Sequence, residues 1–344
     1  MTVSNAYNRP DQLSSALRER VLITARKMGY AGPDPMGSGL RRGHAGAIGV
    51  LYDSRFSFAF DNPEAMAFLQ GVTAATEEEN LGLLLVPRSA PGRADAGYDT
   101  TASSGAVVDG FLAYSVAHND PMLQVALERG VPVVTVDQPE LDGVSFVGID
   151  DTAAARAAAV HLVGLGHRRF GILSLRLKPE ATGGLVGLES RSEGAYQLSY
   201  RRIEGYLSAL SEAGVSRDSV TVYESLASGG SSGEMAAEEL LSSAGRPTAL
   251  LAADDRLALG AISAAVRRGV SVPKELSVVG FGDSSTAPEI GPSLTTVHQD
   301  HEEKGFLAGK VLISEIEGRE RPAPTLLPTR LVVRESTDVA TKAG

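Results

Sequence analysis

The chain has 344 residues, of which 43% are hydrophobic and 22% are charged, values typical of a soluble globular protein with room for two or three domains. It contains no cysteine, which excludes disulfides and thiolate metal sites. No apolar run reaches the length of a membrane span and no apolar signal region stands at the N-terminus, so we expect a cytoplasmic protein without membrane contact.

The net charge of −10 is unevenly distributed along the chain. Residues 1–43 contain seven Lys and Arg against three Asp and Glu, so this segment is basic while the remainder is acidic. A basic segment on an acidic body favours nucleic-acid binding by that segment alone. A solvated basic helix face explains the same charge, and charge alone leaves both interpretations open.

The N-terminal part predicts a helix followed by a linker. Residues 13–28 carry apolar side chains at helical spacing, with Ser14 or Ser15 as a suitable N-cap. Gly29 stands where a left-handed C-cap residue is expected. Residues 31–47 are rich in glycine and proline, which indicates a linker.

From residue 48 onward, short apolar runs alternate with helical patterns. Parallel sheets with helical connections produce this alternation, so the pattern indicates an α/β fold. The expected strands are 48–52, 81–86, 110–114 and 131–136, and the expected helices among them are 63–79 and 121–129.

The last third of the chain supplies a binding-site hypothesis. Residues 248–252 and 276–280 predict buried strands joined by a helix over 257–266, which is the spacing of a right-handed parallel crossover. Asp254 follows the first strand and Asp283 follows the second. Because ligands bind beyond the carboxyl ends of strands in open parallel sheets, we expect both acids near a ligand.

Motifs for catalysis and metal binding are weak. Residues 229–233 match the G-x-S-x-G pattern, but the run is looser than a nucleophile elbow, and a helix start capped by Ser232 or Gly233 is the favoured interpretation. His298 and His301 lack the sequence context of a zinc site. We therefore expect no catalytic set, no metal and no cofactor.

Several separate motifs resemble the lactose-repressor (LacI/GalR) family of transcription regulators, in the family's order and over nearly the whole chain. They are VGIDDTAAARAAAVHLVGLGHRRFGIL, RRIEGYLSAL, PTALLAADDRLALGA, VPKELSVVGFGD, SLTTVHQD and LPTRLVVREST. The resemblance implies an α/β protein with two Rossmann-like subdomains of the type I periplasmic-binding-protein fold, preceded by a truncated helical DNA-binding headpiece.

The same resemblance implies a division of the chain into four parts. The chain is expected to cross between the subdomains three times, so each subdomain is built from discontinuous segments. The parts are a partial helix-turn-helix headpiece at 1–30, a hinge or linker at 31–47, an N-subdomain formed by 48–148 plus 298–328, and a C-subdomain formed by 149–297 plus 329–340.

The headpiece resembles the family's helix-turn-helix from the middle of its recognition helix onward. By this resemblance Asn5 reads a base, since Asn suits a bidentate contact to adenine. Leu40 takes the place of the hinge leucine that wedges into the minor groove, although Gly37 and Gly39 weaken a hinge helix here. The implied DNA-binding residues are Thr2, Ser4, Asn5, Asn8, Arg18 and Leu40.

A small-molecule effector between the subdomains is also implied. Arg202 matches the arginine of the family's R-x-x-G-aromatic motif, which usually contacts the ligand, and Gly205 and Tyr206 complete it. Gly282 departs from the family, because an acid that contacts sugar hydroxyls usually stands there. The implied effector-binding residues are Phe58, Phe60, Asp137, Arg202, Asp254 and Asp283. Salt bridges or surface contacts are the alternative roles for each of them.

The resemblance thus implies a ligand-responsive transcription regulator, expected to be a repressor. It would sense a sugar or nucleoside-like molecule and bind palindromic operator DNA as a homodimer. A solute-binding protein of a sugar transporter would share the body, but the basic N-terminal segment opposes this alternative. A small-molecule enzyme is a further alternative for any α/β fold, and no complete catalytic set supports it.

Overall fold

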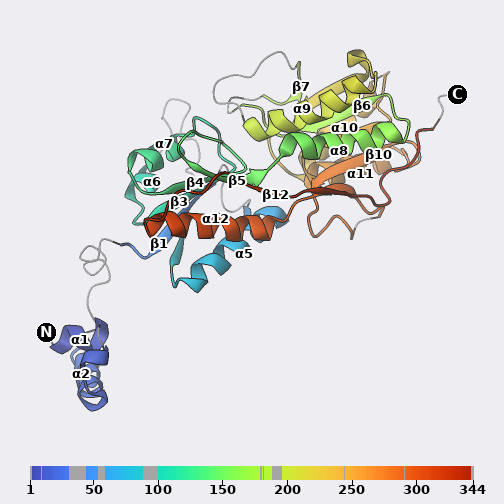
Figure 1. The fold of residues 1–344 in the computed structure, drawn as a ribbon. Helices are drawn as coiled ribbons and strands as arrows, with labels where there is room; N and C mark the ends of the chain where they lie inside the picture. The colour runs from blue at the N-terminus through green and yellow to red at the C-terminus, as the bar shows by residue number, and fades with distance from the viewer. Residues whose placement is uncertain are drawn as a thin grey trace.

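The computed structural model describes residues 2–8, 10–30, 44–52, 59–87, 100–178, 180, 182–187, 196–243, 245–289 and 291–341. Figure 1 shows two α/β lobes and a small helical headpiece. The helices are α1 (Thr2–Asn8), α2 (Ser15–Lys27), α5 (Pro63–Glu78), α6 (Thr101–Gly105), α7 (Pro121–Glu128), α8 (Asp151–Gly164), α9 (Gln197–Glu212), α10 (Gly230–Ser242), α11 (Asp255–Arg267) and α12 (His301–Ile316), with 3-10 turns at Pro10–Gln12 and Arg217–Ser219. The strands are β1 (Ala47–Tyr52), β2 (Gly82–Val86), β3 (Gly110–Tyr114), β4 (Val133–Val136), β5 (Ser145–Ile149), β6 (Phe170–Ser174), β7 (Gly184–Leu185), β8 (Val220–Glu224), β9 (Ala249–Ala252), β10 (Ser277–Gly282), β11 (Thr295–His298), β12 (Thr325–Leu327) and β13 (Arg330–Val332).

The headpiece is formed by α1 and α2. Ser14 caps α2 by accepting a hydrogen bond from the Leu17 backbone N–H, and Gly29 follows the helix with a φ of 70°, as the sequence predicts. The rings of Tyr7 and Tyr30 meet edge to face with centroids 6.1 Å apart. The segment that follows α2 therefore packs against α1 through a small aromatic contact, while Val3 stays exposed.

The first sheet contains six parallel strands in the order β12-β5-β4-β3-β1-β2. Side chains alternate between its two faces because the strand repeat is two residues. Ile48 and Val50 pack in one cluster with Phe68 of α5 and Leu312 of α12, whereas Leu51 packs in another with residues of α7. Helices thus cover both faces, as a parallel sheet requires.

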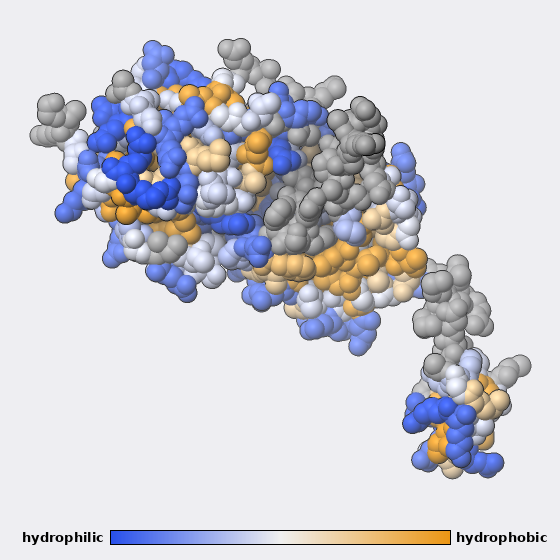
Figure 2. Space-filling view, turned by 180° about the vertical axis from the view of Figure 1, so that it is seen from behind, coloured by the Kyte–Doolittle hydropathy of each residue, from blue (hydrophilic) through white to orange (hydrophobic). Residues whose placement is uncertain are grey.

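One edge of this lobe is apolar. Figure 2 shows a band of hydrophobic surface on the lobe at the right of that view. Strand β2 is the edge strand of the first sheet, and its Leu84 side chain is 40% exposed. A shallow depression beside it is lined by Phe60, Met66, Leu69, Gln70, Thr73, Ala74, Glu77, Leu83 and Leu85.

The second sheet contains seven strands in the order β13-β11-β10-β9-β6-β8-β7. Its central strands are parallel, and the two edge strands β13 and β7 run antiparallel to their neighbours. Phe170 and Ile172 pack with residues of α8 and α9, whereas Leu173 packs with residues of α10 and α11. The same two-residue alternation therefore builds both lobes.

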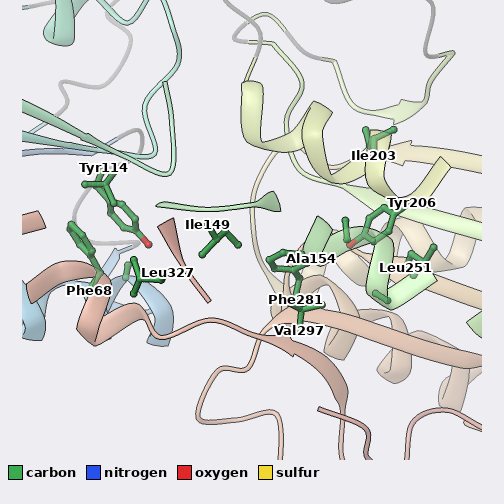
Figure 3. Close-up of a cluster of buried hydrophobic side chains, with 14 of the residues drawn as sticks. Phe68, Tyr114, Ile149, Ala154, Ile203, Tyr206, Leu251, Phe281, Val297 and Leu327 are labelled. Atoms are coloured by element: carbon green, nitrogen blue, oxygen red, sulfur yellow. The ribbon is translucent and has the colours of Figure 1, made fainter. Parts of the chain in front are cut away.

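The described strands pass between the two sheets three times. β5 belongs to the first sheet and β6 to the second, β11 to the second and β12 to the first, and β13 returns to the second. Figure 3 shows Ile149 between buried side chains of the two lobes, with Phe68 and Tyr114 on one side and Phe281 and Val297 on the other. These residues belong to one buried cluster, so the core is continuous across the connections.

Glycines let paired helices approach until their backbones touch. A Cβ on Gly71 of α5 would lie 1.8 Å from the Glu302 carbonyl oxygen of α12, and one on Gly305 of α12 would lie 2.0 Å from the Phe68 carbonyl oxygen. A Cβ on Gly205 of α9 would lie 2.3 Å from the Thr152 carbonyl oxygen of α8. Larger residues cannot occupy these positions without moving a helix.

The expected start of the helix after residue 229 was wrong. Helix α10 begins at Gly230, and its N-cap is Gly229 without a side-chain cap, so neither Ser232 nor Gly233 is the cap. Gly233 instead lies within the helix, where a Cβ would meet the Leu257 carbonyl oxygen at 2.1 Å. Helix packing, rather than a nucleophile elbow, explains why residue 233 is a glycine.

Candidate effector site

A cavity of about 150 Å³ lies at the carboxyl ends of strands from both sheets. Such ends are where ligands bind in open parallel sheets. The described lining residues combine aromatic, neutral polar and charged side chains. They are Tyr52, Asn62, Glu64, Tyr114, Ser115, Asp137, Gln138, Leu175, Arg176, Tyr196, Leu198, Ser199, Arg202, Leu226, Ala227, Ser228, Asp254, Gln299 and His301.

Arg202 of α9 lines this cavity, and only 4% of its surface is exposed. Its Nε donates to Asp151 Oδ1 at 2.8 Å, its Nη1 donates to the Ala253 carbonyl oxygen, and its guanidinium carbon lies 3.7 Å from the Phe281 ring centroid. Burial raises the pKa of Asp151, and the Arg202 guanidinium opposes that rise. The arginine is therefore held rigidly, with its position set by groups from three elements.

Asp137 follows β4 and is held from the first lobe. Its backbone φ is 62°, and its Oδ1 accepts from Lys304 Nζ at 2.6 Å. Lys304 is fully buried and also donates to Gln299 Oε1 at 2.6 Å. A left-handed non-glycine residue costs conformational energy, and such strain concentrates at functional sites. Asp137 is thus fixed at the cavity wall by a buried cation.

Asp254 follows β9 and caps α11, since its Oδ1 accepts from the Leu257 backbone N–H at 2.6 Å. Burial raises the pKa of Asp254. Burial also raises the pKa of the neighbouring Asp255 to about 6, although Thr296 and Ser284 donate hydrogen bonds to its carboxylate. Asp254 lines the cavity, while the buried Asp255 carboxylate faces Thr296 and Ser284 of the second lobe.

Two described effector candidates, Asp283 and Phe60, fall outside the lining. Asp283 accepts from Arg334 Nη2 at 2.6 Å and pairs with His298 Nδ1 at 2.9 Å, so its carboxylate is occupied elsewhere. Phe60 lines the exposed depression beside β2. Phe58 lies outside the described residues. The structure therefore brings together Asp137, Arg202 and Asp254 from the six expected residues.

Several lining residues were missed by sequence reasoning. Glu64 stands in the first turn of α5, and Tyr114 is the last residue of β3. Gln138 follows Asp137, and its Oε1 accepts from the Leu198 backbone N–H at 2.9 Å across the cavity. The strand-end rule was applied to only two predicted strands. Applying it to every predicted strand was the signal that the sequence offered.

Asn5 and Arg18 are both engaged within the headpiece. Asn5 Nδ2 donates to Gln12 Oε1 at 3.1 Å. Arg18 Nε donates to the Ala6 carbonyl oxygen at 3.3 Å, so this arginine also joins α2 to α1. Neither contact buries the side chain deeply, so both remain accessible to a partner.

The remaining implied DNA contacts are on α1 or in the linker. Thr2 and Ser4 are exposed residues of α1, and Asn8 is its last residue. Leu40 lies outside the described residues. Within the described ranges, no cluster of His, Asp and Glu is arranged to hold a metal ion, and no helix is long and apolar enough to cross a membrane.

Comparison with known proteins agrees with this architecture. Residues 159–337 match the family described as periplasmic binding protein-like domain. An HTH-type transcriptional regulator of Mycobacterium tuberculosis is 46% identical over 314 residues, which cover 91% of this chain and 86% of the relative. HTH-type transcriptional regulator IpsA of Corynebacterium glutamicum is 38% identical over 317 residues, covering 92% and 87%.

A solved structure of a LacI-family transcriptional regulator from Corynebacterium glutamicum superposes with a TM-score of 0.76 at 35% identity, covering 98% of this chain and 95% of that one. This chain belongs to the LacI family of helix-turn-helix transcription regulators. A solved complex of another regulator, CelR, with cellobiose has a TM-score of 0.69 at 29% identity over 97% and 95% of the chains.

Membership in the LacI family decides between the three functions left open by the sequence. The two relatives are transcription regulators that this chain matches over 86% and 87% of their length, and the solved LacI-family structure matches 98% of this chain, so that match extends into the headpiece. That finding favours the regulator over a transporter component and points away from an enzyme. The expected type I periplasmic-binding-protein fold is confirmed.

Proposed function

We propose that this regulator represses transcription and that a neutral, hydroxyl-rich effector in the cavity controls its affinity for operator DNA. The observation that carries the proposal is the cavity itself. It lies between two sheets that the chain joins by three connections, so a bound molecule contacts both lobes at once. A ligand that binds one arrangement of the lobes more tightly shifts the population toward it.

The charges around the cavity favour a neutral polyol. Asp137 and Asp254 place carboxylates on the wall, and Arg202 places a cation there. Carboxylates accept hydrogen bonds from hydroxyls, and a guanidinium donates in a fixed geometry. The aromatic side chains of Tyr52 and Tyr114, stacked with centroids 5.6 Å apart, offer a flat apolar wall. This combination suits a sugar, and the CelR–cellobiose complex supports that class.

The domain division that we propose follows the connections between sheets. Residues 48–148 plus 298–328 form the N-subdomain, and residues 149–297 plus 329–340 form the C-subdomain. Membership of the strands in the two sheets supports these boundaries. The headpiece at 1–30 and the linker at 31–47 precede both subdomains, which would let a change in the N-subdomain reach the DNA.

The regulator acts, in this proposal, as a cytoplasmic homodimer. A palindromic operator presents two half-sites, so two headpieces are needed. The apolar band around β2 and α5 supports a second copy at this edge (Figure 2). An exposed apolar edge strand is a liability in a monomer, and pairing with a second chain covers it.

A mobility-shift assay with DNA flanking the regulator's own gene tests the function. We expect a sequence-specific complex whose affinity changes with a sugar that stabilises the protein to heat. Asn5→Ala should weaken the complex while leaving effector binding intact, since it removes an amide that can contact a base. The function is refuted if no specific complex forms, or if no stabilising sugar alters it.

A further inference from the structure

The end of β10 contains a notch that a side chain from the other lobe fills. A Cβ built on Gly282 would lie 1.9 Å from Glu64 Oε1, and the Gly282 φ of 133° belongs to a region that side-chain-bearing residues rarely adopt. The space beside the strand holds the carboxyl group of Glu64.

Glu64 reaches this place from the N-terminus of α5. Asn62 caps the helix, with its Oδ1 accepting from the Glu64 backbone N–H at 3.0 Å, and Pro63 is the first helical residue. The side chain is 14% exposed and lines the cavity. The helix start therefore fixes where the carboxyl group points, and the positive end of the helix dipole favours an acid there.

The carboxyl group of Glu64 is incompletely satisfied. Its Oε1 is buried and has no hydrogen-bond partner among the described residues, and its Oε2 lies 3.8 Å from His301 Nε2. Burial, followed by the charges of Asp255 and Asp254, raises the pKa of Glu64 well above its usual value. Burial lowers the pKa of His301 well below its usual value, so this ring is neutral at pH 7.

A buried acceptor without a donor destabilises the empty protein, and such groups in native structures require an explanation. A ligand hydroxyl in the cavity would supply the missing donor. We propose that Glu64 is a specificity-determining residue of the effector site, with Oε1 accepting a hydrogen bond from an effector hydroxyl, and that Gly282 is the notch required to admit it. This inference rests on the proposed function of the cavity.

The pair places an acid at the end of β10 although position 282 itself has none. The carboxyl group is contributed by the first lobe and reaches the end of a strand in the second. An effector that bonds to Glu64 would therefore be held by the first lobe at a point beside the second. The position of α5, rather than that of β10, therefore determines which hydroxyl of the effector can reach Glu64.

The test begins with thermal shift of the full chain in the presence of glucose, ribose, cellobiose or adenosine. Each probe that stabilises the wild type is then titrated by calorimetry into Glu64→Ala, Glu64→Gln and Glu239→Ala. Glu239 is an exposed acid on α10 and is the control. We expect at least a tenfold loss of affinity in Glu64→Ala, a changed order of preference among the probes in Glu64→Gln, and no change in the control.

Ligand-free stability separates this role from a purely structural one. If Glu64 serves the ligand and not the fold, its unpaired carboxyl group does not stabilise the ligand-free protein. Glu64→Ala should then unfold at the same or a higher temperature than the wild type. Gly282→Ala should weaken binding by displacing the carboxyl group, and the double variant with Glu64→Ala should bind no more weakly than Glu64→Ala alone.

The outcomes distinguish the inference from the proposed function. If the wild type binds a probe and Glu64→Ala binds it within twofold of the wild type, the inference is overturned while the effector cavity stands. The inference is also overturned if Glu64→Ala lowers the unfolding temperature and leaves the preference among probes unchanged. If no probe stabilises the wild type, the sugar-sensing function fails and this inference fails with it.

Discussion

Replacement of Arg202 by alanine should destabilise the second lobe as well as prevent effector binding. The guanidinium pairs with Asp151, whose side chain is 1% exposed and whose Oδ2 already has no partner among the described residues. Removing one member of a buried pair leaves an uncompensated charge and typically costs about 3–5 kcal/mol. Loss of the guanidinium from the Phe281 ring adds to this cost. The loss is a large fraction of an ordinary stability of about 5–15 kcal/mol.

The destabilisation caused by Arg202→Ala should grow as the pH rises. Arg202 holds the pKa of Asp151 down against burial, so its removal lets that pKa rise further. When the pKa of a carboxyl group is higher in the folded state than in the unfolded state, the free energy of unfolding of the protein falls as pH increases. Urea unfolding of Arg202→Ala should therefore show a larger deficit at pH 8 than at pH 5.5.

The matched control is Arg156→Ala, because Arg156 forms an exposed pair with Glu212 on the same helix pair. Exposed pairs contribute little, so the control should unfold with the wild type. A deficit below about 1 kcal/mol in Arg202→Ala, or one that is independent of pH, would refute the reasoning about the buried pair. In that case Arg202 would contact the effector without a structural role.

Three further predictions concern packing, titration and assembly. Gly305→Ala should destabilise the protein by about 1–3 kcal/mol in urea unfolding, because its Cβ would meet the Phe68 carbonyl oxygen; Gly164→Ala, with open space around its Cβ, should be neutral or stabilising by up to about 1 kcal/mol. The raised pKa of Asp255, about 6, predicts that this carboxyl group lowers wild-type stability by about 2 kcal/mol between pH 4 and pH 7, and that Asp255→Asn makes the fall with pH smaller by that amount; equal slopes for both proteins would contradict the assignment. Leu84→Glu should convert a dimer to a monomer in sedimentation, because it places a charge on the apolar edge of β2; a dimer that persists would locate the interface elsewhere.

Much of the architecture was predictable because both lobes obey simple periodicity. The expected strand 110–114 and the helix beginning at Pro63 match β3 and α5 closely, since buried parallel strands are short apolar runs. Arg202 was identified by its motif and lies on the cavity wall. Asp254 was identified by its place after a strand, a rule that follows from sheet topology.

The rest of the site depended on side-chain direction. Asp283 obeys the same rule as Asp254, yet its φ of 55° and its contact with Arg334 turn it away from the cavity. Glu64 is separated from Gly282 by more than two hundred residues, and no local pattern links them. Lys304 reads as a polar residue on a helix but is fully buried beside Asp137. Such contacts arise from tertiary packing, which sequence periodicity does not encode.

The glycine contacts between α5 and α12 have a mechanical consequence. Where backbone meets backbone, no side chain is available to change rotamer and absorb a displacement, so the two helices move as one rigid body. Helix α12 begins directly after the β11 connection between lobes and is 16 residues long, which corresponds to about 24 Å. A rotation of about 10° at that connection would displace the far end of α12 by about 4 Å and carry α5 and its apolar edge along with it. A small closure around the effector would in this way become a movement large enough to reposition one chain of a dimer against the other.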